Sequence, residues 1–440
     1  MTHPSIDSAR TTIAARNDEL RAVLHVLGKP LQNTSIPDAP LAGVPYVLKD
    51  VWDTAGIPTT GGSYRHRARV PPESSRVFVA LHDTGAALLG KSNLCDMAFS
   101  MESQNHIFGP VRNPIDPTRT AGGSTGGGAA AVAAGMAAFD WGTDFGGSIR
   151  LPAAFCGVVG LRLSAKTWPV EREHFPRISP RFWSFCGMGP LARDVATART
   201  VMRAVAPALR ASTERVSMDA SRVFLYLPDE AHRGRWPTFE RDARALLERA
   251  GLDVATDHGL PAPSAIYDVF GGYLAAHFFD FIGDEELSFR EGLAATTLSV
   301  LSNGRLDKRL HPVSASLFAL VGLGKLVRYR DPAPQVARVE ALRAAATRAW
   351  ATGRLLVSPT TTSLPPKHGR AVLAIRAPSF AMLGNLVDAT AIAIPFGRFE
   401  GTGLPRSLQI LGPPGAEEAV LDLAASLSEQ QLEDTPRALR

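Results

Sequence analysis

The sequence predicts an α/β protein in which strands from both ends of the chain build one sheet around a helical middle. Apolar, strand-like runs occur near both ends, at 43–52, 84–89, 354–362, 389–397 and 407–413. Residues 262–345 between them have the apolar spacing of helices. Because neither half completes a sheet alone, we expect one domain over residues 1–440, with a central twisted mixed β-sheet covered by helices on both faces.

The first elements follow from periodicity and composition. Residues 7–27 place apolar side chains at helical spacing, which predicts an N-terminal helix. The run 43–52 predicts a buried strand that ends at a lysine, and 76–83 predicts a helix leading to the strand at 84–89. Prolines and an asparagine predict a loop at 110–117.

Small residues dominate the next stretch. Residues 121–128 are glycine-rich, and the alanine-rich residues 129–139 suit a tightly packed helix. Residues 142–152 are expected to form a further loop, which leads into an apolar turn region at 153–161.

The pattern changes after about residue 200. Residues 221–229 predict a strand, and 239–254 predict an amphipathic helix that turns into another strand. The late strands at 354–362, 389–397 and 407–413 are expected to return to the same sheet.

Composition excludes several classes of function. The 47 Lys and Arg against 42 Asp and Glu give a net charge of +5 with no basic run, a poor match to a nucleic-acid-binding protein. The three cysteines predict reduced thiols and a cytoplasmic location rather than a disulfide framework. The start lacks the features of a secretory signal, and the apolar run 315–324 is well short of the ~18 residues of a transmembrane segment.

Two glycine-rich loops each end in a serine, Gly122-Gly123-Ser124 and Gly146-Gly147-Ser148. Such a loop can direct successive N–H groups at one point, which suits the oxyanion formed when a serine attacks a carbonyl. Taken singly, either loop is equally typical of a turn with a solvated serine. No spaced set of His, Cys, Asp and Glu suggests a metal, and no cofactor is expected.

A serine nucleophile needs a base, and the closest histidine in the sequence is His106. Lysine can serve if its pKa falls by about three units, equivalent to about 4–5 kcal/mol, through burial. Lys49 follows the apolar residues 44–48 and fits such a place. The alternative for Lys49 is a strand-end lysine paired with Asp50.

The joint pattern of these motifs resembles the amidase signature family. The glycine- and serine-rich stretch 122–161 carries most of the resemblance. It extends to GVPYVLKDVWDTAGIPTTGGS at 43–63, GAALLGKSNLCDMAFS at 85–100, FGPVRNPIDPTRTAGGS at 108–124 and GPLARDVATA at 189–198, and it thins to PTTT at 359–362, IAIPFG at 392–397 and LPRSLQILG at 404–412. The resemblance implies a core signature region at about 40–205, a variable helical pocket region at about 213–350 and sheet-completing C-terminal strands at about 354–430.

Carried over position by position, the resemblance implies a Ser–cis-Ser–Lys triad. It makes Ser148 the acylated nucleophile, Ser124 the proton bridge after a cis peptide bond from Gly123, and Lys49 the base. The implied oxyanion hole consists of the backbone N–H groups of Phe145, Gly146, Gly147 and Ser148. The implied supporting residues are Gly123, Thr125, Asp144 and Arg150.

The sequence departs from the family pattern at three places. Thr125 stands where a second serine is usual, and it keeps the hydroxyl. Arg162-Leu163 replaces the common Lys-Pro, and Asp388-Ala389-Thr390 breaks the usual Gly-Leu-Pro stretch. None of these touches the expected triad.

The implied activity is hydrolysis of the C–N bond of a linear, small-molecule amide through an acyl-serine intermediate. Aromatic residues in the middle region suggest an apolar or aryl acyl group, although they also suit a helix core: Tyr267, Phe270, Tyr273, Phe278, Phe279, Phe281 and Phe318. The resemblance is also compatible with a homodimer.

Two alternatives remain. The same triad would serve a glutaminase subunit of an amidotransferase complex, which the core motifs do not separate from a stand-alone amidase. Residues 122–126 also fit G-x-S-x-G, so Ser124 could be the nucleophile of an α/β-hydrolase-type esterase with an Asp and His277, His311 or His368. That elbow needs a preceding strand, which 114–120 does not easily supply.

Overall fold

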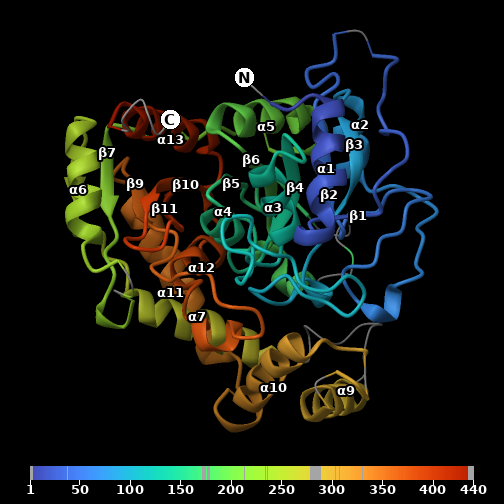
Figure 1. Cartoon of the computed structure of the whole chain (residues 1–440). Coiled ribbons are helices and arrows are strands. Elements are labelled where there is room, and N and C mark those ends of the chain that lie inside the picture. Colours follow the sequence, from blue (N-terminus) through green and yellow to red (C-terminus); the bar gives the residue numbers. More distant parts are fainter. Residues whose placement is uncertain are drawn as a thin grey trace.

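One eleven-stranded sheet organises the chain, with strand order β1-β3-β2-β4-β6-β5-β10-β11-β9-β7-β8 (Figure 1). The structure, a computed structural model, describes residues 3–36, 38–170, 175, 179–212, 214–232, 234, 236–277, 289–302, 304–306, 308–329 and 331–434. The strands are β1 (Val23–Leu24), β2 (Pro45–Lys49), β3 (Ala87–Ser92), β4 (Phe139–Asp144), β5 (Val159–Arg162), β6 (Gly187–Ala192), β7 (Arg222–Leu225), β8 (Asp253–Ala255), β9 (Leu355–Pro359), β10 (Thr390–Arg398) and β11 (Pro405–Gly412). The predicted α/β class with one mixed sheet is confirmed.

Parallel and antiparallel pairs both occur in this sheet. β2 lies between β3 and β4 and is parallel to both, whereas β4 and β6 are antiparallel. β10 joins the two halves, because it pairs antiparallel with β5 on one side and with β11 on the other. The late strands therefore complete the sheet begun by the first half, as predicted.

Helices cover both faces of the sheet. They are α1 (Ile6–Leu20), α2 (Arg76–Asp83), α3 (Gly126–Ala134), α4 (Arg150–Cys156), α5 (Val195–Leu209), α6 (Phe239–Arg249), α7 (Pro263–Ala276), α9 (Phe289–Ser302), α10 (Pro312–Val327), α11 (Ala333–Trp350), α12 (Ser379–Leu386) and α13 (Glu417–Asp434). Short 3₁₀ segments are η1 (Tyr64–His66), η2 (Asp96–Ala98), η4 (Pro180–Phe185), η5 (Glu230–His232) and η6 (Ala371–Ala374). In Figure 1, α5 and α13 lie along one side of the sheet, and α7, α10, α11 and α12 lie on the opposite side.

The core has three parts that follow this layering. The largest packs α2, α5, α6 and α13 on one face of the sheet. A second packs α7, α10, α11 and α12 against β7, β9 and β11. The third lies under α3 and α4, whose alanines pack closely on Val47 and Leu89. The small residues of the third core bring α3 near the sheet, where the glycine-rich loops begin.

The predicted N-terminal helix is shorter than expected. It ends at Leu20 rather than near residue 27, because Arg21 adopts a left-handed conformation at φ 52°. The Asn17 side chain then bonds both the N–H and the C=O of Val23, which turns the chain into β1.

The predicted loop at 142–152 is present only at 145–149, and the predicted turn region at 153–161 was wrong. Residues up to Asp144 belong to β4, and Arg150–Cys156 and Val159–Arg162 form α4 and β5. The prediction took Gly142 as a sign of a loop, but Gly142 lies inside β4. Glycine is needed there because a Cβ would come within 2.7 Å of the Thr125 methyl carbon.

The other predicted elements agree in type and place. The helix at 76–83, the loop at 110–117 and the strands around 45–49, 87–92 and 222–225 are present. The helix predicted at 129–139 instead runs from Gly126 to Ala134, and Phe139 already belongs to β4. Three glycines are therefore helical, and a Cβ at any of them would come within 2.5 Å of a neighbouring atom. The subdivision into signature, pocket and C-terminal regions stays a prediction.

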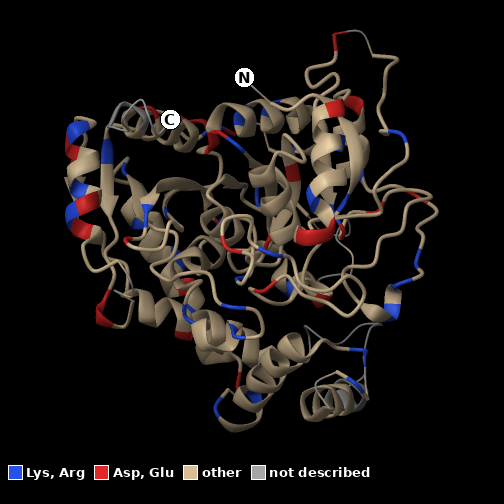
Figure 2. Cartoon of the chain, in the orientation of Figure 1, with Lys and Arg blue, Asp and Glu red and all other residues tan. Residues whose placement is uncertain are grey.

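Charges of both signs are interspersed over the described structure, as along α6 in Figure 2. Within the described residues, every helix is too short or too polar to cross a lipid bilayer.

The two unusual stretches at 162–163 and 388–390 meet in space. Arg162 Nη2 lies 3.1 Å from Asp388 Oδ1, and the other carboxylate oxygen accepts bonds from Ser164 Oγ and the Lys166 N–H. Arg162 is fully buried and also donates to the Ala389 carbonyl. The two departures are therefore one ion pair that ties β5 to β10.

We expect Asp388→Asn to lower the free energy of unfolding by roughly 3 kcal/mol, because it removes the nearer of the two carboxylates that face the buried Arg162 and leaves only Asp144, at 4.0 Å. Urea unfolding followed by circular dichroism measures this change. Asp253→Asn is the matched control, since its ion pair with Arg354 is at the surface and contributes little. Equal midpoints for Asp388→Asn and wild type would show that the ion pair does not hold the strands together.

Candidate active site

Lys49 is the last residue of β2 and is completely buried between β3 and β4. Its Nζ lies 2.7 Å from Ser124 Oγ and 2.9 Å from Thr143 Oγ1. Burial lowers the pKa of Lys49 to about 8, although Cys95 and the carboxylates of Asp140 and Asp144 oppose the shift. The alternative pairing of Lys49 with Asp50 is not present, because Asp50 faces Lys91 at 3.7 Å.

The three oxygen contacts of Lys49 fit both protonation states: an ammonium can donate to all three, and a neutral amine can donate to two and accept from the third. A neutral Nζ has two hydrogens and one lone pair, whereas an ammonium has three hydrogens and none. The carbonyl and hydroxyl oxygens of Thr143, at 3.4 and 2.9 Å, can accept the two hydrogens. The lone pair is then directed to the third contact, Ser124 Oγ, and can accept its proton.

The loop 121–125 holds Ser124 in this position. The Gly123–Ser124 peptide bond is cis, as the family resemblance implied. Gly123 packs against backbone, because a Cβ there would approach Ser100 O to 2.3 Å. Ser103 Oγ donates to the Ser124 carbonyl and accepts the Gly126 N–H, so both sides of Ser124 are fixed.

Ser148 lies beside this pair on the loop between β4 and α4. The Thr125 N–H donates to the Ser148 carbonyl at 3.1 Å, so the two glycine-rich loops are joined at their serines. Ser148 is half-buried and lines an apolar cavity. Among the hydrogen bonds of the described residues, none joins the Ser148 hydroxyl to Ser124. The structure therefore unites Lys49 with Ser124 and places Ser148 next to them without the second hydroxyl contact.

Asp144 and Arg150 support the Ser148 loop. The Asp144 carboxylate accepts from the N–H groups of Gly147 and Ile149 at 2.9 and 3.1 Å and from two nitrogens of the Arg150 guanidinium. Burial alone would raise the pKa of Asp144, but Arg150 and Arg162 hold it well below its usual range. Asp144 is thus a permanent anion that fixes the shape of the loop.

The four amides of the expected oxyanion hole differ in their contacts. The Gly147 N–H is already donated to Asp144 Oδ1 at 2.9 Å. The N–H groups of Gly146 and Ser148 donate to no described residue. These two are the amides best placed to bind an added anion at the cavity.

Several residues of the site had no signal in the sequence. Asn385 accepts from Arg150 at 2.9 Å and donates to the Asp144 carbonyl at 2.7 Å, and Gln409 accepts from Arg150 at 3.0 Å. They lie more than 230 residues away along the chain, on α12 and β11. Thr143 was overlooked because the prediction assigned it to a loop. It is the next-to-last residue of β4, where a strand can direct a hydroxyl towards the Ser148 loop.

The cavity in front of Ser148 is large and almost entirely apolar. It encloses about 950 Å³ including its open mouth. Its walls come from 98–101, Gly123, the Ser148 loop, α7, α10 and the segment from η6 to α12: Ala98, Phe99, Ser100, Met101, Gly123, Phe145, Gly146, Ser148, Leu151, Tyr267, Phe270, Gly271, Leu274, Val313, Leu317, Val321, Ala371, Val372, Ile375, Pro378 and Met382. No charged side chain is among these described lining residues.

The aromatic residues of the middle region divide between cavity and core. Tyr267 and Phe270 line the cavity. Tyr273 packs on Phe185, and Phe318 stacks on Phe99 at 4.5 Å, so both belong to the helical core. Phe278, Phe279 and Phe281 lie outside the described residues.

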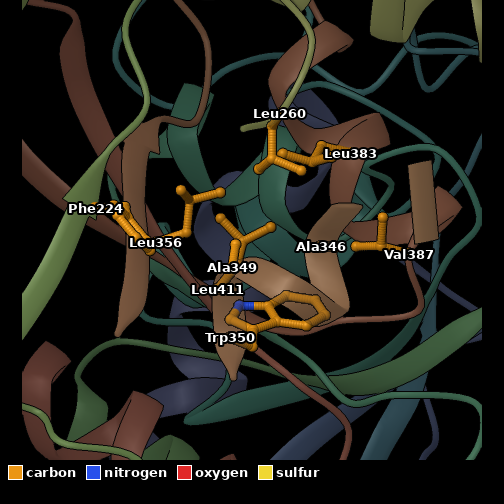
Figure 3. Close-up of a pocket in the computed structure, with 9 residues that line it drawn as sticks. All are labelled: Phe224, Leu260, Ala346, Ala349, Trp350, Leu356, Leu383, Val387 and Leu411. Carbon is orange, nitrogen blue, oxygen red and sulfur yellow. The ribbon is translucent and has the colours of Figure 1, made fainter. Parts of the chain in front are cut away.

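A smaller apolar pocket lies away from this site, between α11, α12 and the strands β7, β9 and β11 (Figure 3). Nine apolar residues line it: Phe224, Leu260, Ala346, Ala349, Trp350, Leu356, Leu383, Val387 and Leu411. It offers no reactive group.

The Ser124-elbow alternative does not fit the structure. Residues 121–125 are not preceded by a strand, and Ser124 Oγ contacts the Lys49 amine. An Asp–His–Ser chain does occur among the described residues, and it joins Asp229, His232 and Ser379 at 2.7 and 2.9 Å. Ser379 is fully buried and donates to the Arg376 carbonyl, so this chain holds a turn and offers no nucleophile. The described residues hold no group of three His, Cys, Asp or Glu side chains arranged for a metal.

Comparison with known proteins agrees with this geometry. A family model described as Amidase matches residues 11–231, half of the chain. The chain is 31% identical to a glutamyl-tRNA(Gln) amidotransferase subunit from Synechococcus sp. (strain RCC307), over 95% of this chain and 92% of the relative. It is 30% identical to the corresponding protein from Halobacterium salinarum, over 89% and 96%.

Solved structures share the fold. The peptide amidase of Stenotrophomonas maltophilia aligns with a TM-score of 0.72 at 24% identity, over 99% of this chain and 94% of that one. The glutamyl-tRNA(Gln) amidotransferase subunit from Thermotoga maritima aligns with a TM-score of 0.70 at 22% identity, over 96% and 90%. The fold and the buried lysine–serine pair define an α/β hydrolytic enzyme. The chain belongs to the amidase signature family.

Proposed function

We propose that this chain is a serine amidase that cleaves the C–N bond of small amides with an apolar or aryl acyl group. The observation that carries the proposal is the 2.7 Å contact between a buried lysine amine and Ser124 Oγ, beside a serine that opens onto an apolar cavity.

In the proposed reaction, Ser148 Oγ attacks the amide carbonyl. Its proton passes to Ser124 as the Ser124 proton passes to neutral Lys49, and the amides of Gly146 and Ser148 bind the oxyanion. The proton returns through Ser124 to the amine, which must be protonated to leave. Water then attacks the acyl-serine by the same route. The missing Ser148–Ser124 contact is expected to form with substrate, because catalytic hydrogen bonds often close only in the complex.

The cavity supports an apolar acyl group. Glutamine carries an ammonium and a carboxylate, and both would lose water without a partner against the described lining residues. An alkyl or aryl acyl group instead gains from burial, at about 25 cal/mol for each Å² removed from water.

A second candidate is the glutaminase subunit of an amidotransferase complex. The relatives that are 30–31% identical are named as subunits of glutamyl-tRNA(Gln) amidotransferase, so the sequence comparison favours this candidate over a stand-alone amidase. The two candidates require the same triad and differ in the acyl pocket and in the need for partner subunits.

Ser148→Ala is expected to lower kcat/KM by at least about 10³-fold and to abolish labelling by a fluorophosphonate probe, because the nucleophile is lost. Mass spectrometry of the labelled wild type should find the adduct on Ser148. An adduct on Ser124 instead would reverse the proposed roles of the two serines.

The rate of acylation should rise with pH through a midpoint near 8, the pKa of Lys49, because only the neutral amine accepts a proton. Two units below that value about 1% of Lys49 is neutral, so the rate at pH 6 should be about 100-fold below its plateau. Stopped-flow measurement of acylation across this range gives the midpoint, and the acylation rate of Lys49→Ala should show no such midpoint. A wild-type rate that is flat between pH 6 and 9 would contradict a lysine base.

An activity screen with glutamine and with aryl and alkyl amides separates the two candidates. We expect kcat/KM for glutamine to be at least about 100-fold lower than for the aryl and alkyl amides, because the charged ends of glutamine would be buried without partners. Leu317→Gln, in the cavity wall, should weaken turnover of apolar amides, whereas Leu320→Gln, on the exposed side of α10, should not. Preferred turnover of glutamine would establish the second candidate.

A further inference from the structure

A buried carboxylate on β4 has no role in the proposed reaction. Asp140 is the second residue of the strand and is completely buried. Ser92 Oγ donates to its Oδ1 at 2.7 Å, and its Oδ2 accepts no hydrogen bond from the described residues. A buried carboxylate with half of its acceptor capacity unused is costly in the absence of a nearby positive charge.

Asp140 faces the same side of the sheet as the proposed base. In the β2–β4 ladder Asp140 aligns with Val47, and in the β2–β3 ladder Ser92 aligns with Lys49. Since alternate residues of a strand share a face, Val47 and Lys49 project together from β2. The Asp140–Ser92 hydrogen bond therefore spans β2 beside the stem of Lys49.

The helix above leaves room for this carboxylate. A Cβ at Gly128 of α3 would come within 2.3 Å of Asp140 Oδ2. α3 contains glycines, alanines and one valine, so it offers no ionisable group to Asp140. The charges that act on Asp140 come from the strands alone, as Lys49 on β2 and Lys91 on β3.

We propose that Asp140, held by Ser92, is a positioning residue that sets the protonation of Lys49 and hence the pH at which the enzyme becomes active. A negative charge beside Lys49 favours its ammonium form and keeps the amine basic enough to accept the proton of Ser124. Without Asp140, Lys49 would lose its proton at lower pH and would be a weaker base. This inference rests on the proposed function.

The other charges around Lys49 do not replace this role. Asp144 also faces Lys49, but its carboxylate is bonded to Arg150 and to the Ser148 loop. Cys95 and Cys186 face Lys49 as well, and burial raises the pKa of each thiol to about 12, so both are neutral in the working range. Asp140 is the remaining carboxylate that acts on Lys49, and burial raises its pKa to about 7 despite the Ser92 hydrogen bond.

The test measures the pH dependence of Ser148 labelling by a fluorophosphonate, which needs no knowledge of the substrate. Asp140→Asn keeps the shape of the side chain and removes its charge. We expect the midpoint to move down by roughly one pH unit, so that at pH 7.5, above the pKa of Asp140, the variant reaches roughly a threefold larger fraction of its own plateau rate than wild type.

Ser92→Ala provides a second variant in case Asp140→Asn does not fold. It removes the hydrogen bond that stabilises the charged carboxylate, so it should move the midpoint in the same direction by a smaller amount. Glu417→Gln is the matched control, because this buried carboxylate is bonded to Trp168 and Thr167 and does not act on Lys49. Its midpoint should equal that of wild type.

Unmoved midpoints in Asp140→Asn and Ser92→Ala, with normal labelling of Ser148, would overturn the role of Asp140 and leave the proposed function standing. Absence of wild-type labelling at Ser148, or a wild-type rate without a midpoint near 8, would instead overturn the proposed function.

Discussion

The burial of Lys49 is the constraint on which the rest of the site depends. An ammonium at the end of β2 would lose its water, and burial therefore lowers its pKa to about 8. The 2.7 Å contact with Ser124 connects this amine, which is neutral above that pKa, to the loop that carries Ser124. A sheet with strands on both sides of β2 is what excludes water here, so the fold itself supplies the condition for the chemistry.

A second interaction, between Asp144 and Arg150, connects the site to the C-terminal part of the domain. Asp144 binds the backbone of the Ser148 loop, and Arg150 connects Asp144 to Asn385 and Gln409. These partners come from α12 and β11, so the form of the loop depends on contacts with the C-terminal part of the chain. The Arg162–Asp388 pair links the same two parts of the chain a short distance away. This dependence explains why neither half of the sequence would form a site alone.

The sequence predicted the class of fold from local patterns, and its resemblance to the amidase signature family supplied the three residues of the proposed triad. Alternating apolar runs mark strands, and a glycine–glycine–serine loop marks a place where the backbone must approach another group. Prediction was wrong where glycine has a tertiary reason, as at Gly142, which lies within β4 opposite the Thr125 side chain. Asn385 and Gln409 could not be predicted at all, since their role exists only through contacts across more than 230 residues. The pairing of Arg162 with Asp388 was hidden for the same reason, although each residue was recognised as unusual.

The cavity of this chain and the names of its relatives point to different substrates. Relatives that share 30–31% identity are named as amidotransferase subunits, while the walls around Ser148 are apolar. Family membership is carried by the signature region and the sheet, whereas the acyl pocket is built from α7, α10 and the segment before α12. Such a division allows the reaction to be kept while the substrate changes.

The central claim is that burial brings the pKa of the Lys49 amine down to near 8, and a direct titration of that amine tests it. Protein labelled with ¹³C at lysine Cε, with Lys49→Arg used to assign the signal, would report the protonation of this side chain by NMR. We predict a titration midpoint near pH 8. A Lys49 signal that stays in the ammonium form to pH 10 or above, as for an exposed lysine, would contradict the account.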